Sequence, residues 1–207
     1  MMLIPLYVHP LDDPAAWQPH RFLAGVSLVI NVHNGPGAVR DAAYLDATRQ
    51  LNRAGVPTLG YVDLDYGARL NGDVWRDIVG WSPYRVGGVF FDRVPSDWAG
   101  VDYVAQVVRA VRGTVVLNPG TGCHAAYGAL ADVVCTFEGS WADYRRRDLG
   151  RDWSNAAHLV YGVPPAELAE AQALLETRAC HGLVTDLDLP LPYAGLPPAM
   201  RQEVMLG

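Results

Sequence analysis

The 207-residue chain has few cysteines, and their spacing gives them no shared role. Cys123, Cys135 and Cys180 are odd in number and far apart in the sequence. This pattern excludes a disulfide framework and a zinc knuckle, both of which need paired, closely spaced cysteines. We interpret the three residues as small apolar side chains within the core.

Long apolar runs and an excess of basic charge are also missing. No run reaches the ~18 apolar residues that a membrane span requires, and the N-terminus lacks the basic segment of a signal peptide. The net charge of −6 argues against a nucleic acid or an anionic membrane as partner. We therefore expect a protein that is cytoplasmic as given, or secreted with its leader removed. Its length suits one domain over residues 1–207.

What the sequence does contain is a repeated unit: a short apolar run, a polar loop and a helical segment. The clearest run, 87–93, is apolar until it ends in Asp92 and Arg93. Such a run is typical of a strand that is buried on both faces of a parallel sheet. Eight runs of this kind predict strands at 3–8, 27–32, 58–63, 87–93, 114–118, 132–138, 157–162 and 182–186.

Helical patterns separate most of these strands. Helices are predicted at 38–54, 71–81 (capped by Asn71), 101–111, 124–130 (short) and 165–178, with a polar helix or loop at 142–151. Strict alternation of strand and helix predicts a parallel sheet, and eight units predict an α/β fold of the (β/α)₈ TIM-barrel type. An open doubly wound sheet is the competing architecture. It would carry a glycine-rich phosphate turn after the first strand, where this chain has residues 9–13, so we expect no nucleotide cofactor.

Polar side chains lie at or just after the end of every predicted strand. In a closed barrel these ends meet at one rim, so the sequence predicts a single polar, acidic site there. The candidate residues are His9, Asn31, His33, Asp63, Asp65, Asp92, Arg93, Asn118, Glu138, Tyr161 and Asp186, with the aromatic residues Tyr66 and Trp141 in the same loops.

A structural role competes with a functional one for several of these residues. An aspartate that follows a strand is more often a helix cap than a catalytic group, and this interpretation applies to Asp63 and Asp186. Glu138 differs, because glutamate is a poor cap and here directly follows an apolar run. We therefore weight Glu138, and similarly Asp92, toward function.

Several carboxylates among aromatic side chains suit glycoside hydrolysis. That reaction needs one carboxylic acid to protonate the leaving oxygen and a second carboxylate to attack the sugar or activate water. Aromatic rings offer apolar faces to the sugar's C–H groups. A metal-dependent enzyme using His9, His33, Asp63 and Asp92 is a weaker alternative, because no H-x-H or H-E-x-x-H motif occurs.

Six short motifs in order resemble a known family. They are Tyr7-Val8 with Pro10, Asn34-Gly35-Pro36-Gly37, Gly60-Tyr61-Val62 with Tyr66-Gly67, Gly88-Val89-Phe90-Phe91-Asp92, Leu117-Asn118-Pro119-Gly120 and Phe137-Glu138. The chain resembles the spherulin 4 proteins (spherulation-specific family 4) from Leu3 to about Asp186. The resemblance implies a (β/α)₈ barrel without a cofactor or metal, and an endo-acting hydrolase of α-1,4-linked galactosamine or N-acetylgalactosamine polymers.

The resemblance also implies site residues. The family places an Asp-Glu pair after the fourth strand and a Glu after the sixth, which here correspond to Asp92, Arg93 and Glu138. The replacement of a glutamate by Arg93 leaves three alternatives. Asp92 and Glu138 act alone as the carboxylate pair; or Asp63, Asp65 or Asp186 takes the missing role; or the barrel binds a polysaccharide without cleaving it. We expect Glu138 as general acid/base, Asp92 as nucleophile or electrostatic partner, and an acetylated or acidic sugar opposite Arg93.

Overall fold

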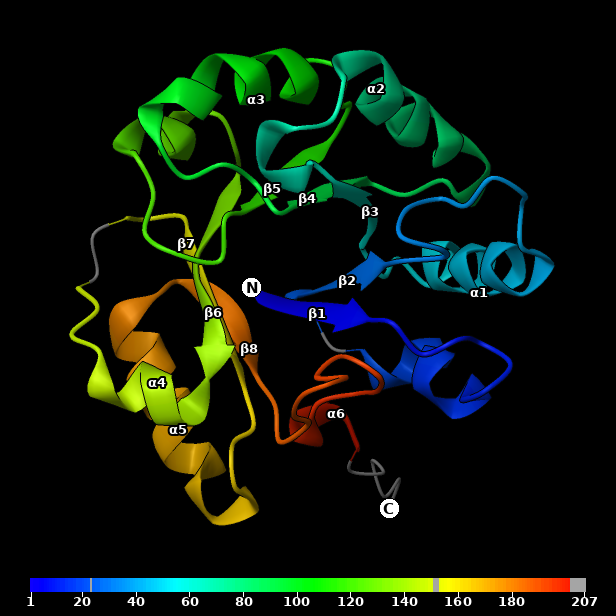
Figure 1. The fold of residues 1–207 in the computed structure, drawn as a ribbon. Helices are drawn as coiled ribbons and strands as arrows, with labels where there is room; N and C mark the ends of the chain where they lie inside the picture. The colour runs from blue at the N-terminus through cyan, green and yellow to red at the C-terminus, as the bar shows by residue number, and fades with distance from the viewer. Residues whose placement is uncertain (23, 151–152, 202–207) are drawn as a thin grey trace.

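The computed structural model describes residues 1–22, 24–150 and 153–201, and it contains a closed barrel of eight parallel strands in sequential order (Figure 1). The predicted fold class is therefore confirmed. The strands are β1 (Met2–Leu6), β2 (Val26–Ile30), β3 (Thr58–Asp63), β4 (Gly88–Asp92), β5 (Thr114–Asn118), β6 (Val133–Ser140), β7 (Ala156–Tyr161) and β8 (His181–Val184). Two of these, β3 and β5, have the predicted bounds.

The helical layer outside the barrel is less regular than predicted. Its α-helices are α1 (Ala42–Arg53), α2 (Asn71–Gly80), α3 (Val101–Val108), α4 (Trp141–Arg146), α5 (Leu168–Arg178) and α6 (Pro198–Arg201). After β1 and β5 the described chain forms 3-10 turns instead, at Pro14–Trp17, Pro19–Arg21 and Ala125–Ala129. Short loops of this kind are consistent with a barrel built from little more than 200 residues.

Two helix starts differ from the predictions for local reasons. The helix predicted at 38–54 begins at Ala42, because the Asp41 carboxylate accepts hydrogen bonds from the first-turn amides of Ala43 and Tyr44. Asn71 is not the cap of α2. It is the first helical residue, and its side-chain amide donates a hydrogen bond to the side-chain oxygen of Gln106. The capping interaction predicted for Asn71 was wrong.

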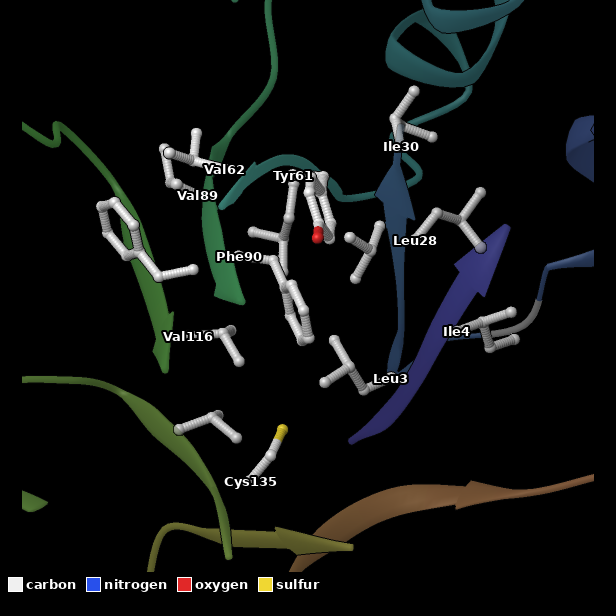
Figure 2. Close-up of a cluster of buried hydrophobic side chains, with 14 of the residues drawn as sticks. Leu3, Ile4, Leu28, Ile30, Tyr61, Val62, Val89, Phe90, Val116 and Cys135 are labelled. Atoms are coloured by element: carbon white, nitrogen blue, oxygen red, sulfur yellow. The ribbon is translucent and has the colours of Figure 1, made fainter. Parts of the chain in front are cut away.

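Side chains that alternate along each strand fill the barrel. Register pairs join Tyr61 to Phe90 and Phe90 to Val116, so these residues point to the same side of the sheet. Figure 2 shows them gathered between the strands together with Leu3 and Cys135. Since alternate residues share a face, Asp63, Asp92 and Asn118 lie one step further along the same inward-facing rows. The interior is therefore apolar in its middle and polar at the carboxyl end of the strands.

A β-bulge interrupts this alternation in β6. The pairing with β7 shifts between Cys135, which lies opposite Ala157, and Phe137, which lies opposite His158. Thr136 and Phe137 both contact His158 on the outer side of the sheet, through a 3.1 Å contact of the Thr136 hydroxyl and a ring contact of Phe137. The extra residue returns Glu138, which pairs with Leu159, to the inward-facing side.

Close packing between the barrel and its outer layer leaves no room at one glycine. A Cβ atom on Gly60 would lie 2.5 Å from the ring of Trp81, whose indole N–H donates to the Tyr61 carbonyl.

Cys135 is buried as predicted, whereas Cys123 and Cys180 are only half-buried. Within the described ranges, no helix has the length and apolar character that crossing a membrane would demand.

Candidate active site

Three residues at the ends of β4, β5 and β6 form the centre of the site. The side-chain amide of Asn118 donates one hydrogen bond to Asp92 Oδ1 at 2.8 Å and another to Glu138 Oε2 at 2.6 Å. Because both oxygens bind the same nitrogen, they are at most about 5.4 Å apart, the sum of these two distances. The structure thus brings together the two carboxylates predicted to be catalytic.

Both carboxyl groups are half-buried, and their surroundings shift their protonation. Burial raises the pKa of Asp92, opposed by hydrogen bonds from the Tyr61 hydroxyl, the Arg93 backbone amide and Asn118. Burial likewise raises the pKa of Glu138, opposed by hydrogen bonds from Asn118 and Tyr193. Asp92 has one more donor than Glu138, so Glu138 is the carboxyl group better suited to hold a proton.

Three tyrosines that sequence reasoning left out of the candidate set surround this pair. Tyr61 donates its hydroxyl to Asp92 Oδ2 at 2.8 Å, and Tyr193 donates to Glu138 Oε1 at 2.6 Å. The Tyr7 ring packs edge-on against both of these tyrosines. Burial raises the pKa of all three, helped by the nearby carboxylates, so they stay protonated as donors.

The sequence could have indicated only some of these three tyrosines as site residues. Tyr61 lies two residues before Asp63 in β3 and therefore faces the same side, which the strand period alone could have shown. Tyr193 belongs to the proline-rich segment after β8, in which the sequence indicated no site residue. Its carbonyl accepts a hydrogen bond from the Tyr7 amide and its ring is buried at the barrel's carboxyl end. Nothing in its local sequence indicated this position.

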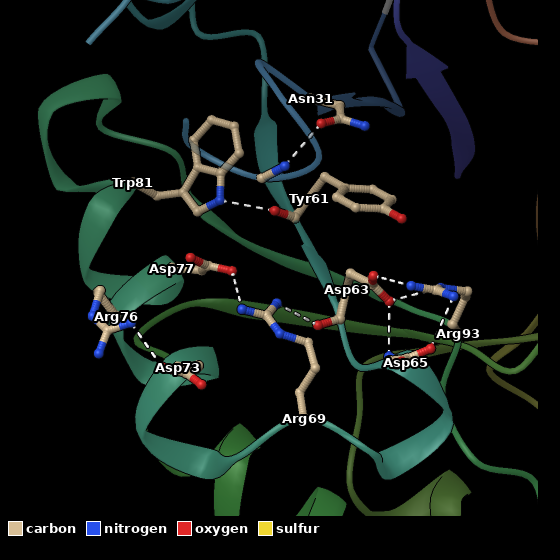
Figure 3. A network of polar contacts seen from close by, with 11 residues as sticks. Asn31, Tyr61, Asp63, Asp65, Arg69, Asp73, Arg76, Asp77, Trp81 and Arg93 are labelled. Carbon is tan, nitrogen blue, oxygen red and sulfur yellow. Dashed lines mark hydrogen bonds and ion pairs between the residues drawn. The ribbon is translucent and has the colours of Figure 1, made fainter. Parts of the chain in front are cut away.

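Arg93 pairs with carboxylates other than Asp92 and Glu138, and Figure 3 shows its guanidinium beside Asp63 and Asp65. Its guanidinium binds both carboxylate oxygens of Asp63 and also pairs with Asp65 at 2.9 Å. Burial acts to raise the pKa of Asp63, but the hydrogen bonds and charge of Arg93 and the hydrogen bonds from the Asp65 amide and Asn34 together hold that pKa below its ordinary value. Asp63 and Asp65 are thus committed to Arg93, which leaves them poorly placed to replace a missing catalytic carboxylate.

Tyr66 and Tyr161 lie at the margin of the site. Tyr66 is 64% exposed and carries the Arg93 guanidinium over its ring, 5.7 Å from the ring centre. Its backbone has φ = +54°, a left-handed conformation that is uncommon without glycine. Tyr161, at the end of β7, has a pKa raised by burial and by the Glu138 charge, which places it near that carboxylate.

Other predicted residues have structural partners outside the carboxylate pair. His9 Nε2 lies 3.3 Å from the α1 cap, Asp41, and Asn31 Oδ1 accepts from the Gly35 amide (Figure 3). His33 is exposed in the loop after β2. These three residues shape or flank loops at the rim.

Trp141 does not lie where the sequence predicted, and Asp186 lies just after β8 as predicted but has an ion-pair partner of its own. Trp141 is 3% exposed, packs with Phe137 and Tyr144 outside the barrel, and donates its indole N–H to Glu167. It cannot line the site, because it begins α4 and turns into the outer layer. Asp186 lies beyond the end of β8, and both its carboxylate oxygens bind Arg201 at 2.8 Å.

The metal alternative gains no support from the arrangement of side chains. Across residues 1–22, 24–150 and 153–201, no three His, Cys, Asp or Glu side chains are grouped as metal ligands. Two surface hollows lie at the amino-terminal end of the barrel, one beside Gly88 and Ala110 and one beside Met2 and Gly182. That end supports stability in this architecture, whereas chemistry sits at the carboxyl end.

Comparisons with known proteins bear on the family and the fold of the chain. The model of a family described as Spherulation-specific family 4 matches residues 1–206. Spherulin-4 of Physarum polycephalum is 34% identical over 149 residues, which cover 66% of this chain and 44% of that protein, so the match spans less than half of the curated relative.

Two solved structures extend the comparison. Aspergillus clavatus Sph3, crystallised in complex with GalNAc, aligns with a TM-score of 0.77 at 26% identity, over 96% of this chain and 93% of Sph3. A Rubisco-like protein from Rhodopseudomonas palustris aligns with a TM-score of 0.51 at 12% identity, over 88% of this chain and 59% of that one. The second likeness shows the barrel fold alone.

Proposed function

The chain belongs to spherulation-specific family 4, and from this premise we propose that it is a glycoside hydrolase acting on a hexosamine polysaccharide. The observation that carries the proposal is the amide of Asn118, which holds the Asp92 and Glu138 carboxylates at a fixed, short separation. The GalNAc bound to Sph3 supports a galactosamine-type sugar as substrate. An α-1,4-linked N-acetylgalactosamine polymer cleaved internally is the specific substrate that we propose.

The separation of the two carboxylates favours one stereochemical course. Carboxyl groups are about 5–5.5 Å apart in retaining glycosidases and ~6.5–9.5 Å apart in inverting ones. The facing oxygens of Asp92 and Glu138 lie within about 5.4 Å of each other. We therefore propose retention, in which a carboxylate attacks the anomeric carbon and the sugar–enzyme ester is then hydrolysed.

The surroundings of each carboxyl group favour one division of roles. Asp92 accepts hydrogen bonds from Tyr61, Asn118 and the Arg93 amide, which stabilise its ionised form as the nucleophile. Glu138 has fewer donors and a raised pKa, so it holds the proton that the leaving oxygen needs. After the leaving group departs, the ionised Glu138 can accept a proton from the attacking water.

The position of Arg93 bears on the charge of the substrate. Its guanidinium is paired with two carboxylates, Asp63 and Asp65, so the charge of this cluster is not positive. The acetylated or acidic sugar expected opposite Arg93 therefore gains no support from the charge of this cluster. The proposal of an acetylated sugar rests on the GalNAc complex of Sph3.

Hydrolysis by Glu138→Gln and Asp92→Asn variants tests the proposal. We expect each to lose at least a hundredfold in kcat on α-1,4-linked N-acetylgalactosamine polymer, because each removes a group that bonds or transfers a proton in the reaction. Asp186→Asn is the matched control, since it changes a carboxylate that follows a barrel strand but binds Arg201. An unchanged rate for Glu138→Gln on a substrate that the wild type cleaves would refute this site.

Binding without cleavage is a second candidate, favoured by Arg93 at the position of a family glutamate. It predicts that the wild type binds the oligosaccharide with no release of reducing ends at any pH. The two candidates separate on one preparation, by calorimetric binding and a reducing-end assay.

A further inference from the structure

The exposure of the tryptophans singles out one residue that the proposed reaction does not use. Trp17, Trp81 and Trp141 are buried, each with its indole N–H donated to a protein oxygen. Trp98, in contrast, is 65% exposed, which exceeds the 44% of Trp75 on α2. A large aromatic ring left in water forgoes the stabilisation that burial would give. Its position therefore calls for a reason other than packing.

Trp98 lies on the same end of the barrel as the carboxylate pair. It begins the 3-10 turn Trp98–Gly100, between the end of β4 and the start of α3. The turn is firmly held: the Asp97 carboxylate accepts from the Gly100 amide, and the Asp97 carbonyl accepts from the buried Tyr127 hydroxyl. The ring is thus presented to solvent by a fixed loop.

The loop after β5 connects this ring to Glu138. The Gly120 carbonyl accepts from the Glu138 amide at 3.0 Å, and four residues later the His124 amide donates to Ser96 in the β4 loop. The His124 ring contacts Trp98 at 4.9 Å between ring centres. Four extended residues span at most about 14 Å, which bounds the distance between the backbone positions of Gly120 and His124.

The loop after β3 continues the same surface on the other side. A Cβ atom on Gly67 would lie 3.6 Å from Pro95, so the β3 and β4 loops are in contact. Gly67 follows the exposed Tyr66, whose amide donates to the Arg93 carbonyl at 2.6 Å. Exposed aromatic rings therefore stand on two neighbouring loops at the end of the barrel that carries the carboxylate pair, and backbone hydrogen bonds hold these loops in place.

We propose that Trp98, braced by His124, is a binding platform for a sugar unit of the polymer other than the one that is cleaved. The inference rests on the proposed function, because it assigns the ring to that substrate. The flat indole face would pack on the apolar C–H face of a hexosamine ring, while the sugar's hydroxyl groups stay in water. Such a platform favours chains over single sugars, as an endo-acting enzyme requires.

Calorimetric binding in a Glu138→Gln background tests the platform without turnover. The probes are N-acetylgalactosamine and its α-1,4-linked oligomers from disaccharide to hexasaccharide. We expect Trp98→Ala to leave affinity for the monosaccharide unchanged and to lower affinity for the hexasaccharide about tenfold. Trp98→Phe should retain most of that affinity. Trp75→Ala is the matched control, since Trp75 is a partly exposed tryptophan on α2.

Each outcome separates the platform from the reaction. Equal hexasaccharide affinity for Trp98→Ala and Trp75→Ala would overturn the platform, even if the wild type hydrolyses the polymer. Loss of affinity in Trp98→Ala alone would support it, even if the wild type cleaves nothing and the proposed hydrolysis fails. If the Glu138→Gln protein and the wild type bind none of these probes, both proposals are overturned.

Discussion

Replacing Tyr193 by phenylalanine tests the assignment of Glu138 as the proton donor. The change removes one hydroxyl, which donates a 2.6 Å hydrogen bond to Glu138 Oε1, and leaves the ring that packs on Tyr7. A hydrogen bond to an ionised carboxylate lowers its pKa, so its loss must raise the pKa of Glu138. The direction adds to the rise that burial already produces.

The expected size follows from the strength of that bond. Hydrogen bonds to charged groups contribute about 1.5–3 kcal/mol, and 1.36 kcal/mol corresponds to one pKa unit. Because Glu138 is only half-buried, water can replace part of the lost bond. We therefore expect the pKa of Glu138 to rise by about one unit. A general acid must be protonated, so activity should persist to a pH about one unit higher.

The assay is the pH dependence of kcat/KM on the polymer. In Tyr193→Phe the basic limb of the profile should move upward, while the acidic limb, governed mainly by Asp92, stays close to its wild-type position. Tyr127→Phe is the control, because that buried hydroxyl donates to a backbone carbonyl instead. A basic limb that does not move, or movement of the acidic limb alone, would refute the division of roles between Glu138 and Asp92.

Three further predictions concern stability. Glu138→Gln should raise the free energy of unfolding at neutral pH, because it removes a desolvated carboxylate. This gain should shrink in acid, where the raised pKa keeps the wild-type carboxyl group protonated, and urea titrations across pH measure the difference. Burial lowers the pKa of His158 to about 4, so acid favours the unfolded state, in which the imidazole can take up a proton. The free energy of unfolding of the wild type should fall by about 3 kcal/mol as the pH drops from about 6.5 to about 4, and His158→Gln should flatten that decline. Gly60→Ala should cost about 1–3 kcal/mol by displacing the Trp81 ring, whereas Gly72→Ala, in open space on α2, should stabilise by up to about 1 kcal/mol in thermal melts.

The sequence predicted the barrel well because its strands are wholly buried. A run such as 87–93 has one interpretation when both its faces are apolar, and eight such runs alternating with helices leave few topologies. The convergence of Asp92, Asn118 and Glu138 followed from the fold, since neighbouring parallel strands end at the same rim. These predictions needed only strand identity and order.

Predictions failed where position depends on tertiary contacts. Trp141 was placed among the site's aromatic residues, yet it starts a helix and turns its ring into the outer apolar layer. Asp186 follows β8, but its carboxylate forms an ion pair with Arg201, which lies in α6 near the end of the described chain. Tyr193 reaches Glu138 from a proline-rich tail with no periodic pattern. Local sequence carries no record of such long-range pairings.

The bulge in β6 makes the direction of the Glu138 side chain depend on how the strand pairs as well as on which residues it contains. If residues 135–138 paired without a bulge, Phe137 would face the barrel's lumen and Glu138 would face the helices. The bulge absorbs the extra residue, so Thr136 and Phe137 both face outward and Glu138 faces inward. A relative that keeps the glutamate and lacks the residue at 136 would be expected to have a regular strand that still directs the glutamate inward. Alignments of relatives should therefore consider the length of this strand as well as the identity of its residues.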